Sequence, residues 1–79
     1  MDITTAVRNR ILGLCQERDI TVNKLATICG IPPGTLVNVM NGRNGLSVLT
    51  LKKICDGLEI TLAEFFNTEI FNNLEQEIR

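Results

Sequence analysis

The sequence predicts an all-α fold, a compact domain of five helices followed by an apolar C-terminal tail that could itself be helical. Three observations predict it. Apolar residues recur at three- and four-residue steps along most of the 79 residues. Ser or Thr precedes several of these runs, as helix N-caps do, and Gly or Asn-Gly steps separate them. We therefore expect one domain over residues 1–66 and a tail over residues 67–79.

Residues 4–18 are expected to form the first helix, because their apolar residues fall on one side of it. Cys15 belongs to this side and is one of three cysteines, an odd number with no CxxC pair. Each cysteine stands at an apolar helical position. We interpret them as buried reduced thiols, with a disulfide or a metal site as the alternative.

Residues 21–41 contain two short apolar patterns with Gly30 between them. Thr21 is a good N-cap for the first, and a glycine suits the positive φ of a sharp corner. Pro33 suits the first turn of the second helix, where a missing N–H costs nothing, and Gly42 suits its C-cap, so this helix is expected over residues 33–41. The pattern predicts a helix-turn-helix; an αα-hairpin of some other small bundle is the alternative.

Two more helices are expected after the loop NGRNG at residues 41–45. Ser47 should cap the fourth helix, and Thr61 with Glu64 fits a capping box that opens a short fifth helix carrying Leu62, Phe65 and Phe66. An apolar stripe on the fourth helix should close the core over the first three. It comprises Val48, Leu51, Ile54, Cys55 and Leu58.

The tail carries Ile70, Phe71, Leu74 and Ile78 on one side of a helix, if a helix forms there. A chain this short has little core left to cover that side. We expect these four residues to form a two-fold dimer interface. The alternative is that they fold back onto the first or fifth helix of the same chain.

The composition argues against catalysis. The chain contains no His, Trp or Tyr, which excludes Ser-His and Cys-His catalysis and most zinc sites. The acidic residues lie mainly on solvated helix faces. We expect no enzyme, no metal, no cofactor and no small-molecule substrate.

The chain lacks a membrane or export signal. No apolar run approaches the ~20 residues of a membrane span, and the N-terminal residues lack the apolar core of a signal peptide. We therefore expect a cytoplasmic protein with no membrane partner.

The net charge of −1 hides an uneven distribution. Residues 1–55 hold seven basic and three acidic residues, a net +4, whereas residues 56–79 hold one basic and six acidic residues, a net −5. The helix-turn-helix lies in the basic part. An acidic tail would have to face away from a polyanion.

Several short segments are specific in their order and spacing: K-L-A at residues 24–26, G-I at 30–31, T-L at 35–36, N-G at 41–42 and TLKKICDGLEITLAEFF at 50–66. With them the chain resembles the Cro and phage-repressor type helix-turn-helix family (XRE-like transcriptional regulators) over nearly its whole length. The resemblance implies a lambda-repressor-like domain that binds double-stranded DNA sequence-specifically and regulates transcription. Members commonly act as repressors and as homodimers on two-fold operators.

The resemblance also implies that helix 33–41 enters the DNA major groove. The base-facing positions of the family fall on Pro33, Gly34, Val37 and Asn38, with Thr35 near the backbone. An Asn can bind N6 and N7 of adenine together, and a Val can touch a thymine methyl. Phosphate contacts carry over to the start of the second helix and to the loop after the third, at Val22, Asn23, Asn41, Gly42, Arg43 and Asn44.

This chain departs from the family early in that helix. Pro32, Pro33 and Gly34 cannot hydrogen-bond base edges through side chains, so specificity would depend on a few contacts with DNA shape, or on close approach of the backbone at Gly34. Arg43 and Asn44 could also form an ordinary solvated turn. The alternative function is a protein-interaction module of the same fold, such as an antitoxin-like partner, which the net acidic charge and the sparse recognition helix favour.

Overall fold

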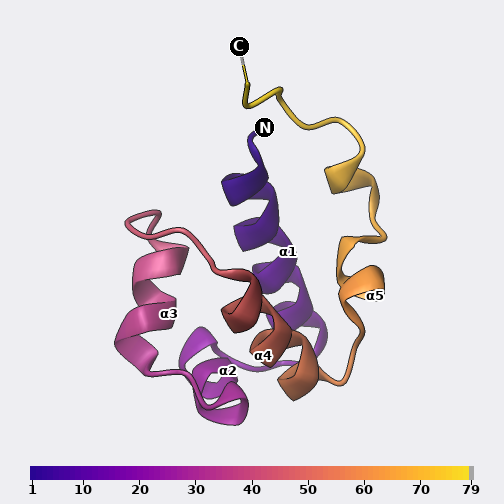
Figure 1. Ribbon diagram of the computed structural model, residues 1–79. Coiled ribbons are helices and arrows are strands. Elements are labelled where there is room, and N and C mark those ends of the chain that lie inside the picture. The colour runs from indigo at the N-terminus through magenta and orange to yellow at the C-terminus, as the bar shows by residue number, and fades with distance from the viewer. Residues whose placement is uncertain (79) are drawn as a thin grey trace.

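The computed structural model describes residues 1–78, and residue 79, the last of the predicted tail, lies outside the described residues. Within the described part the chain is all-helical, as predicted, and its elements are α1 (Ile3–Glu17), α2 (Val22–Cys29), α3 (Pro33–Met40), α4 (Val48–Leu58), α5 (Leu62–Phe66) and a 3₁₀ turn η1 (Glu69–Phe71). Figure 1 shows α1 and α4 in the middle, α2 and α3 on one side of them, and α5 with the tail on the other. Every helix in residues 1–78 is too short or too polar to span a bilayer.

The predicted N-caps are confirmed. The side chains of Thr21, Ser47 and Thr61 each accept a hydrogen bond from the backbone N–H three residues later. At the start of α5 the Glu64 carboxylate also accepts from the Thr61 N–H at 2.9 Å, which completes the capping box. Asp2 caps α1 in the same way. These contacts satisfy N–H groups that a helix start leaves without a partner.

The first four helices end at residues with left-handed backbone, and the next residue in each case bonds back to a carbonyl five positions earlier. The left-handed residues are Asp19, Gly30, Gly42 and Glu59, with φ of 54°, 68°, 77° and 58°. After α1, α2 and α4 the next residue is an isoleucine that packs on the core. Their N–H···O distances are 3.0 Å for Ile20 to Cys15, 2.9 Å for Ile31 to Ala26 and 3.0 Å for Ile60 to Cys55.

The core gathers the apolar sides of all five helices around the fully buried Phe65. Gly57 of α4 lies so close to α2 that a Cβ at this position would be 2.5 Å from the Cys29 sulfur. The predicted stripe of α4 is confirmed from Leu51 onward, but the prediction for Val48 is wrong. Val48 is the first residue of α4 and is 77% exposed, because the helix meets the core only one turn later, at Leu51.

The tail is not a helix, contrary to the expectation from its apolar pattern. Its only helical part among the described residues is η1, a single 3₁₀ turn at Glu69–Phe71, which no side chain caps. Asn72 and Asn73 follow directly, and Asn is a weak helix former because its side chain competes for backbone hydrogen bonds. A single turn without capping side chains is a poor nucleus, so a longer helix does not extend from it.

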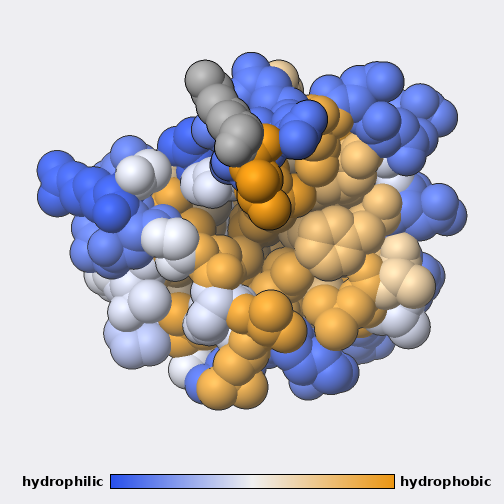
Figure 2. Space-filling view, turned by 45° about the horizontal axis from the view of Figure 1, so that its top comes forward, coloured by the Kyte–Doolittle hydropathy of each residue, from blue (hydrophilic) through white to orange (hydrophobic). Residues whose placement is uncertain are grey.

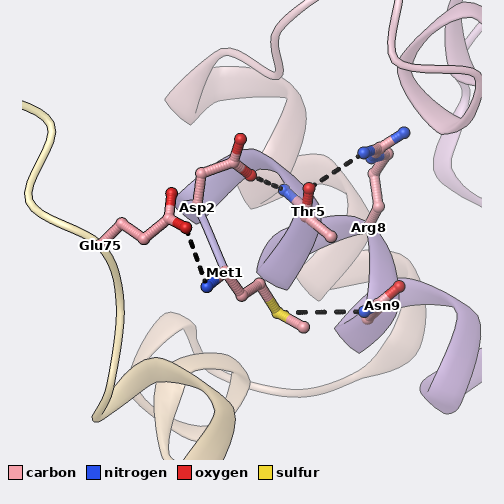
Figure 3. Close-up of polar contacts among 6 residues, drawn as sticks. All are labelled: Met1, Asp2, Thr5, Arg8, Asn9 and Glu75. Carbon is pink, nitrogen blue, oxygen red and sulfur yellow. Dashed lines mark hydrogen bonds and ion pairs between the residues drawn. The ribbon is translucent and has the colours of Figure 1, made fainter.

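The tail instead folds back along α1 of the same chain, which is the alternative considered above. The Phe71 ring lies 4.9 Å from that of Phe66 and 6.0 Å from that of Phe65, centroid to centroid. Further along, the Glu75 N–H donates to the Met1 carbonyl at 3.0 Å, and the Glu75 carboxylate lies 3.5 Å from the N-terminal amine (Figure 3). Glu75 in the tail therefore contacts the N-terminus directly.

Candidate nucleic-acid interface

The corner between α2 and α3 sets the direction of α3. Gly30 adopts a left-handed conformation there, and the Ile31 N–H bonds back into α2 while the Ile31 side chain is buried. Pro32 is extended, and Pro33 begins α3 as its first residue. The predicted helix-turn-helix is therefore present, with α3 ending at Met40 and Asn41 as its C-cap, one residue earlier than expected.

One side of α3 is buried and the opposite side is open. Leu36 and Val39 are buried in the core. The four predicted base-facing residues recur at helical spacing on the other side. Three of them, Pro33, Gly34 and Val37, are exposed, and Asn38 is half-buried.

Gly34 has two unusual properties at this surface. A Cβ added there would meet nothing within 4 Å, so the fold itself does not require a glycine. Its N–H has no acceptor within residues 1–78, since the Pro32 carbonyl receives the N–H groups of Thr35 and Leu36 instead. Within the described residues, an N–H without an acceptor therefore stands at the positive end of α3.

The end of α3 brings the predicted loop residues against Asn38. The Asn38 carbonyl accepts the N–H of Arg43 at 2.9 Å and that of Asn44 at 3.4 Å, around the left-handed Gly42. This is the same corner that closes α1, α2 and α4, but the residue after the left-handed position is here an exposed arginine and not a core isoleucine. Among the corners described above, the one beside the open side of α3 is the one in which a charged residue follows the left-handed position.

The start of α2 offers a second set of backbone donors. The Thr21 hydroxyl accepts the N–H of Lys24 at 3.0 Å, while those of Val22 and Asn23 have no acceptor in the described residues. Asn23 is exposed, whereas the Val22 side chain packs partly on the core and leaves only its backbone for a ligand. Free N–H groups at a helix start are suited to phosphate oxygens.

Arg8 of α1 supports the end of α3, and nothing in the local sequence pattern singles it out. Its two terminal nitrogens donate to the Met40 carbonyl at 3.4 Å and to the Thr5 hydroxyl at 3.2 Å, the second of which Figure 3 draws. A Cβ at Gly42 would lie 2.9 Å from the guanidinium. Because α3 ends with free carbonyls, a cation beneath it is favourable. The contact with Met40 joins residues 32 positions apart, which explains why sequence spacing could not predict it.

The four residues predicted for a dimer interface do not form one continuous exposed surface. Phe71 packs against the core, and Ile70 and Leu74 are half-buried. Ile78 is 80% exposed. The acidic tail lies beyond α1 and α4 as seen from α3 (Figure 1), which keeps its charge away from the open side of α3.

The thiols and carboxylates form no obvious metal centre. In residues 1–78 no three His, Cys, Asp or Glu side chains gather closely enough to hold a metal ion. Cys15 and Cys55 are buried and Cys29 is half-buried, all as free thiols, and desolvation raises the pKa of each above 9.0. They act as small apolar core residues.

Comparison with known proteins supports a DNA-binding regulator. Residues 10–69 match the family model of the Cro/C1-type HTH DNA-binding domain. No curated protein matches the chain. Among solved structures, the chain is similar to prophage Lp1 protein 11, with 25% identity and a TM-score of 0.81 over 94% of this chain and 100% of that one.

A second solved structure shares the fold. It is a transcriptional regulator of the HTH_3 family from Vibrio cholerae, with 24% identity and a TM-score of 0.75 over 85% of this chain. This chain spans 38% of the length of that regulator, so the likeness concerns the fold of one part of it. Because the family model covers most of the 79 residues, including both helices of the turn motif, the chain belongs to the Cro/C1-type helix-turn-helix DNA-binding domain family.

Proposed function

We propose that the chain is a sequence-specific transcriptional repressor that inserts α3 into the DNA major groove and binds a two-fold operator as a homodimer. The observation that carries the proposal is the open side of α3, which ends at a corner carrying Arg43 where the other corners carry isoleucine. Such a domain can repress transcription by occupying DNA that the polymerase needs.

The base contacts would come from Asn38 and Val37, with Pro33 and Gly34 closer to the start of the helix. The Asn38 amide has no hydrogen-bond partner within residues 1–78, so both its donor and its acceptor are available to an adenine edge. Val37 is 38% exposed and offers an apolar contact to a thymine methyl. Direct readout is then limited to few positions, and DNA shape would supply the rest of the specificity.

The backbone contacts would come from both ends of the helix-turn-helix. At the α3 corner Arg43 supplies a charge that can bind a phosphate through two N–H groups, and Asn44 an amide beside it. Asn41 and Gly42 lie beside these in the chain, and Thr35 is in the first turn of α3; all three predicted contacts are exposed. At the start of α2 the free N–H groups of Val22 and Asn23 would bind a second phosphate.

The test selects bound sequences from a random duplex pool and then measures affinity for the consensus. Asn38→Ala should lower discrimination at one base pair by about 1–3 kcal/mol. Arg43→Ala should weaken binding to all duplexes alike and reduce the slope of log K against log salt by about 0.9. The matched controls are Asn72→Ala and Lys53→Ala, which change an exposed amide and an exposed cation outside the candidate interface.

Several outcomes would contradict the proposal. These are a pool with no consensus, a double variant of Asn38 and Arg43 that binds as tightly as the unchanged chain, and an affinity that does not depend on salt. The last result would favour the protein-interaction module instead.

A further inference from the structure

An apolar groove opens on the surface beside the α3 corner and plays no part in the DNA contacts proposed above. Its floor is formed by Val7, Val39 and Leu51, and its rim by Ile3, Val48 and Phe66. We call it the α1/α4 groove; its volume is about 220 Å³. Figure 2, which brings the side with the chain ends forward, shows apolar residues gathered across this face with hydrophilic residues around them.

Two exposed aliphatic residues begin α4, and the first of them, Val48, lines the groove. Val48 at its rim is 77% exposed and its neighbour Leu49 is 66% exposed, although both belong to a helix whose later residues close the core. Phe66 and Ile3 on the rim are 39% and 36% exposed. Isolated exposed apolar residues are common, but a hollow bordered by several of them indicates an interaction surface.

We propose that a second copy of this chain occupies the groove, through a two-fold interface in which Val48 and Leu49 of each copy enter the hollow of the other. A two-fold interface uses the same surface on both copies, so the surface must carry both a projection and a hollow that accepts it. The α1/α4 groove carries both. For scale, an apolar cavity of roughly 150 Å³ holds a benzene molecule, so 220 Å³ is enough for aliphatic side chains of this size.

The charges around the groove permit this pairing. Residues near a two-fold axis face their own copies, so an uncompensated charge there would repel its equivalent. The only charged side chain that lines the groove within the described residues is Arg8. Its guanidinium already donates to the Met40 carbonyl and the Thr5 hydroxyl of its own chain. The remaining lining is apolar or hydroxyl-bearing, which suits a self-complementary surface.

The position of the groove also fits a two-fold operator, and this step rests on the proposed function. The groove includes Val39 near the end of α3 and Leu46 just after the loop, so pairing through it brings the two α3 corners toward the axis. On a two-fold operator the two α3 helices would have to lie about 34 Å apart, one helical turn of DNA.

The tail predicted for the dimer is a weaker candidate than the groove. Phe71 is used in the core of its own chain, and Ile78 is exposed but has no hollow beside it among the described pockets. Ile78→Glu is therefore a matched control for Val48→Glu, since both place a carboxylate at a strongly exposed apolar position.

The test is sedimentation of the full chain without DNA, from micromolar concentrations up to about 1 mM, where even a weak dimer is populated. Val48→Glu should raise the dimer dissociation constant at least tenfold, Leu49→Glu should act in the same direction, and Ile78→Glu should leave the constant unchanged. Circular dichroism checks that each variant is folded. If Val48→Glu does not fold, Leu49→Glu still tests the interface.

The results separate this inference from the proposed function. A chain that is monomeric at the highest concentration overturns the inference, and so does a dimer lost with Ile78→Glu but kept with Val48→Glu. If the dimer responds as expected while no duplex is bound, the proposed function fails and the two-fold groove interface stands.

Discussion

Replacing Gly57 by alanine tests how closely α4 is held against α2, and hence what positions the helix-turn-helix. An added Cβ would lie 2.5 Å from the Cys29 sulfur, 3.2 Å from Cγ2 of Ile28 and 3.4 Å from the Cys29 Cα. The first distance is far inside van der Waals contact, so the thiol has to rotate or α2 has to move. Protein interiors are packed too densely to absorb such a change without cost.

The magnitude follows from two opposing effects. Overpacking of this kind costs about 1–3 kcal/mol, whereas alanine has a better helix propensity than glycine by roughly 1 kcal/mol. Gly57→Ala should therefore lose up to about 2 kcal/mol of unfolding free energy. Gly13→Ala in α1 meets nothing within 4 Å and should gain about 0.5–1 kcal/mol. The two variants should differ by about 0.5–3 kcal/mol, or roughly 2–24 °C in Tm for a domain of this size.

Thermal denaturation followed by circular dichroism measures this difference, and a double-mutant cycle locates its origin. Cys29→Ala removes the sulfur atom, so in its background Gly57→Ala should cost at least about 1 kcal/mol less than in the unchanged chain. If Gly57→Ala melts as high as Gly13→Ala, or if the cycle shows no coupling, α2 and α4 are not in the close contact described, and the reasoning fails.

Three further perturbations test separate contacts. Gly34→Ala should raise stability by about 0.5–1 kcal/mol, because its methyl faces open space, and should weaken duplex binding at least several-fold in a titration; unchanged affinity would remove Gly34 from the interface. Arg8→Met should lower the unfolding free energy by about 1–2 kcal/mol in urea, because it removes the donor to the Met40 carbonyl, and equal stability would refute that role. Hydrogen bonds from Thr61 hold the pKa of Glu64 below 4.5, so its stabilisation is present above that pH and lost as the pH falls through the lowered value; Glu64→Gln should make Tm less sensitive to acid, and an unaltered acid dependence would contradict this.

Local chemistry explains why much of the fold was predictable. Thr21, Ser47 and Thr61 cap helices because a hydroxyl next to a helix start satisfies N–H groups that otherwise lack partners. Gly30 ends α2 because its positive φ suits a residue without Cβ. Each of these effects acts within about five residues, so the sequence alone reports it.

The parts that could not be predicted depend on contacts between distant residues. The tail had a helical pattern, but Phe71 packs against Phe65 and Phe66, and the 3₁₀ turn ends there, before Asn72. Periodicity placed Val48 on the side of α4 that faces the core. It could not predict that α4 meets the core only at Leu51, one turn later, which leaves Val48 exposed.

The candidate interface likewise has a part that local sequence predicts and a part that depends on contacts between distant residues. The exposed side of α3 follows from helical spacing and agrees with the structure. The positioning of the α3 corner by Arg8 joins α1 to the end of α3, and no local pattern contains that information. The dimer residues were expected where the apolar tail seemed to lack a partner, whereas the hollow at α1 and α4 forms only when the helices assemble.

The stability of the domain can be raised at Glu59, the acidic residue at the turn after α4. Glu59 adopts a φ of 58°, a conformation that costs an ordinary side chain roughly 1–2 kcal/mol, and glycine would adopt it freely. Glycine also gains freedom in the unfolded chain, which offsets part of the benefit. Because this turn lies away from α3 (Figure 1), the thermal tolerance of the domain can be adjusted there without altering the candidate interface.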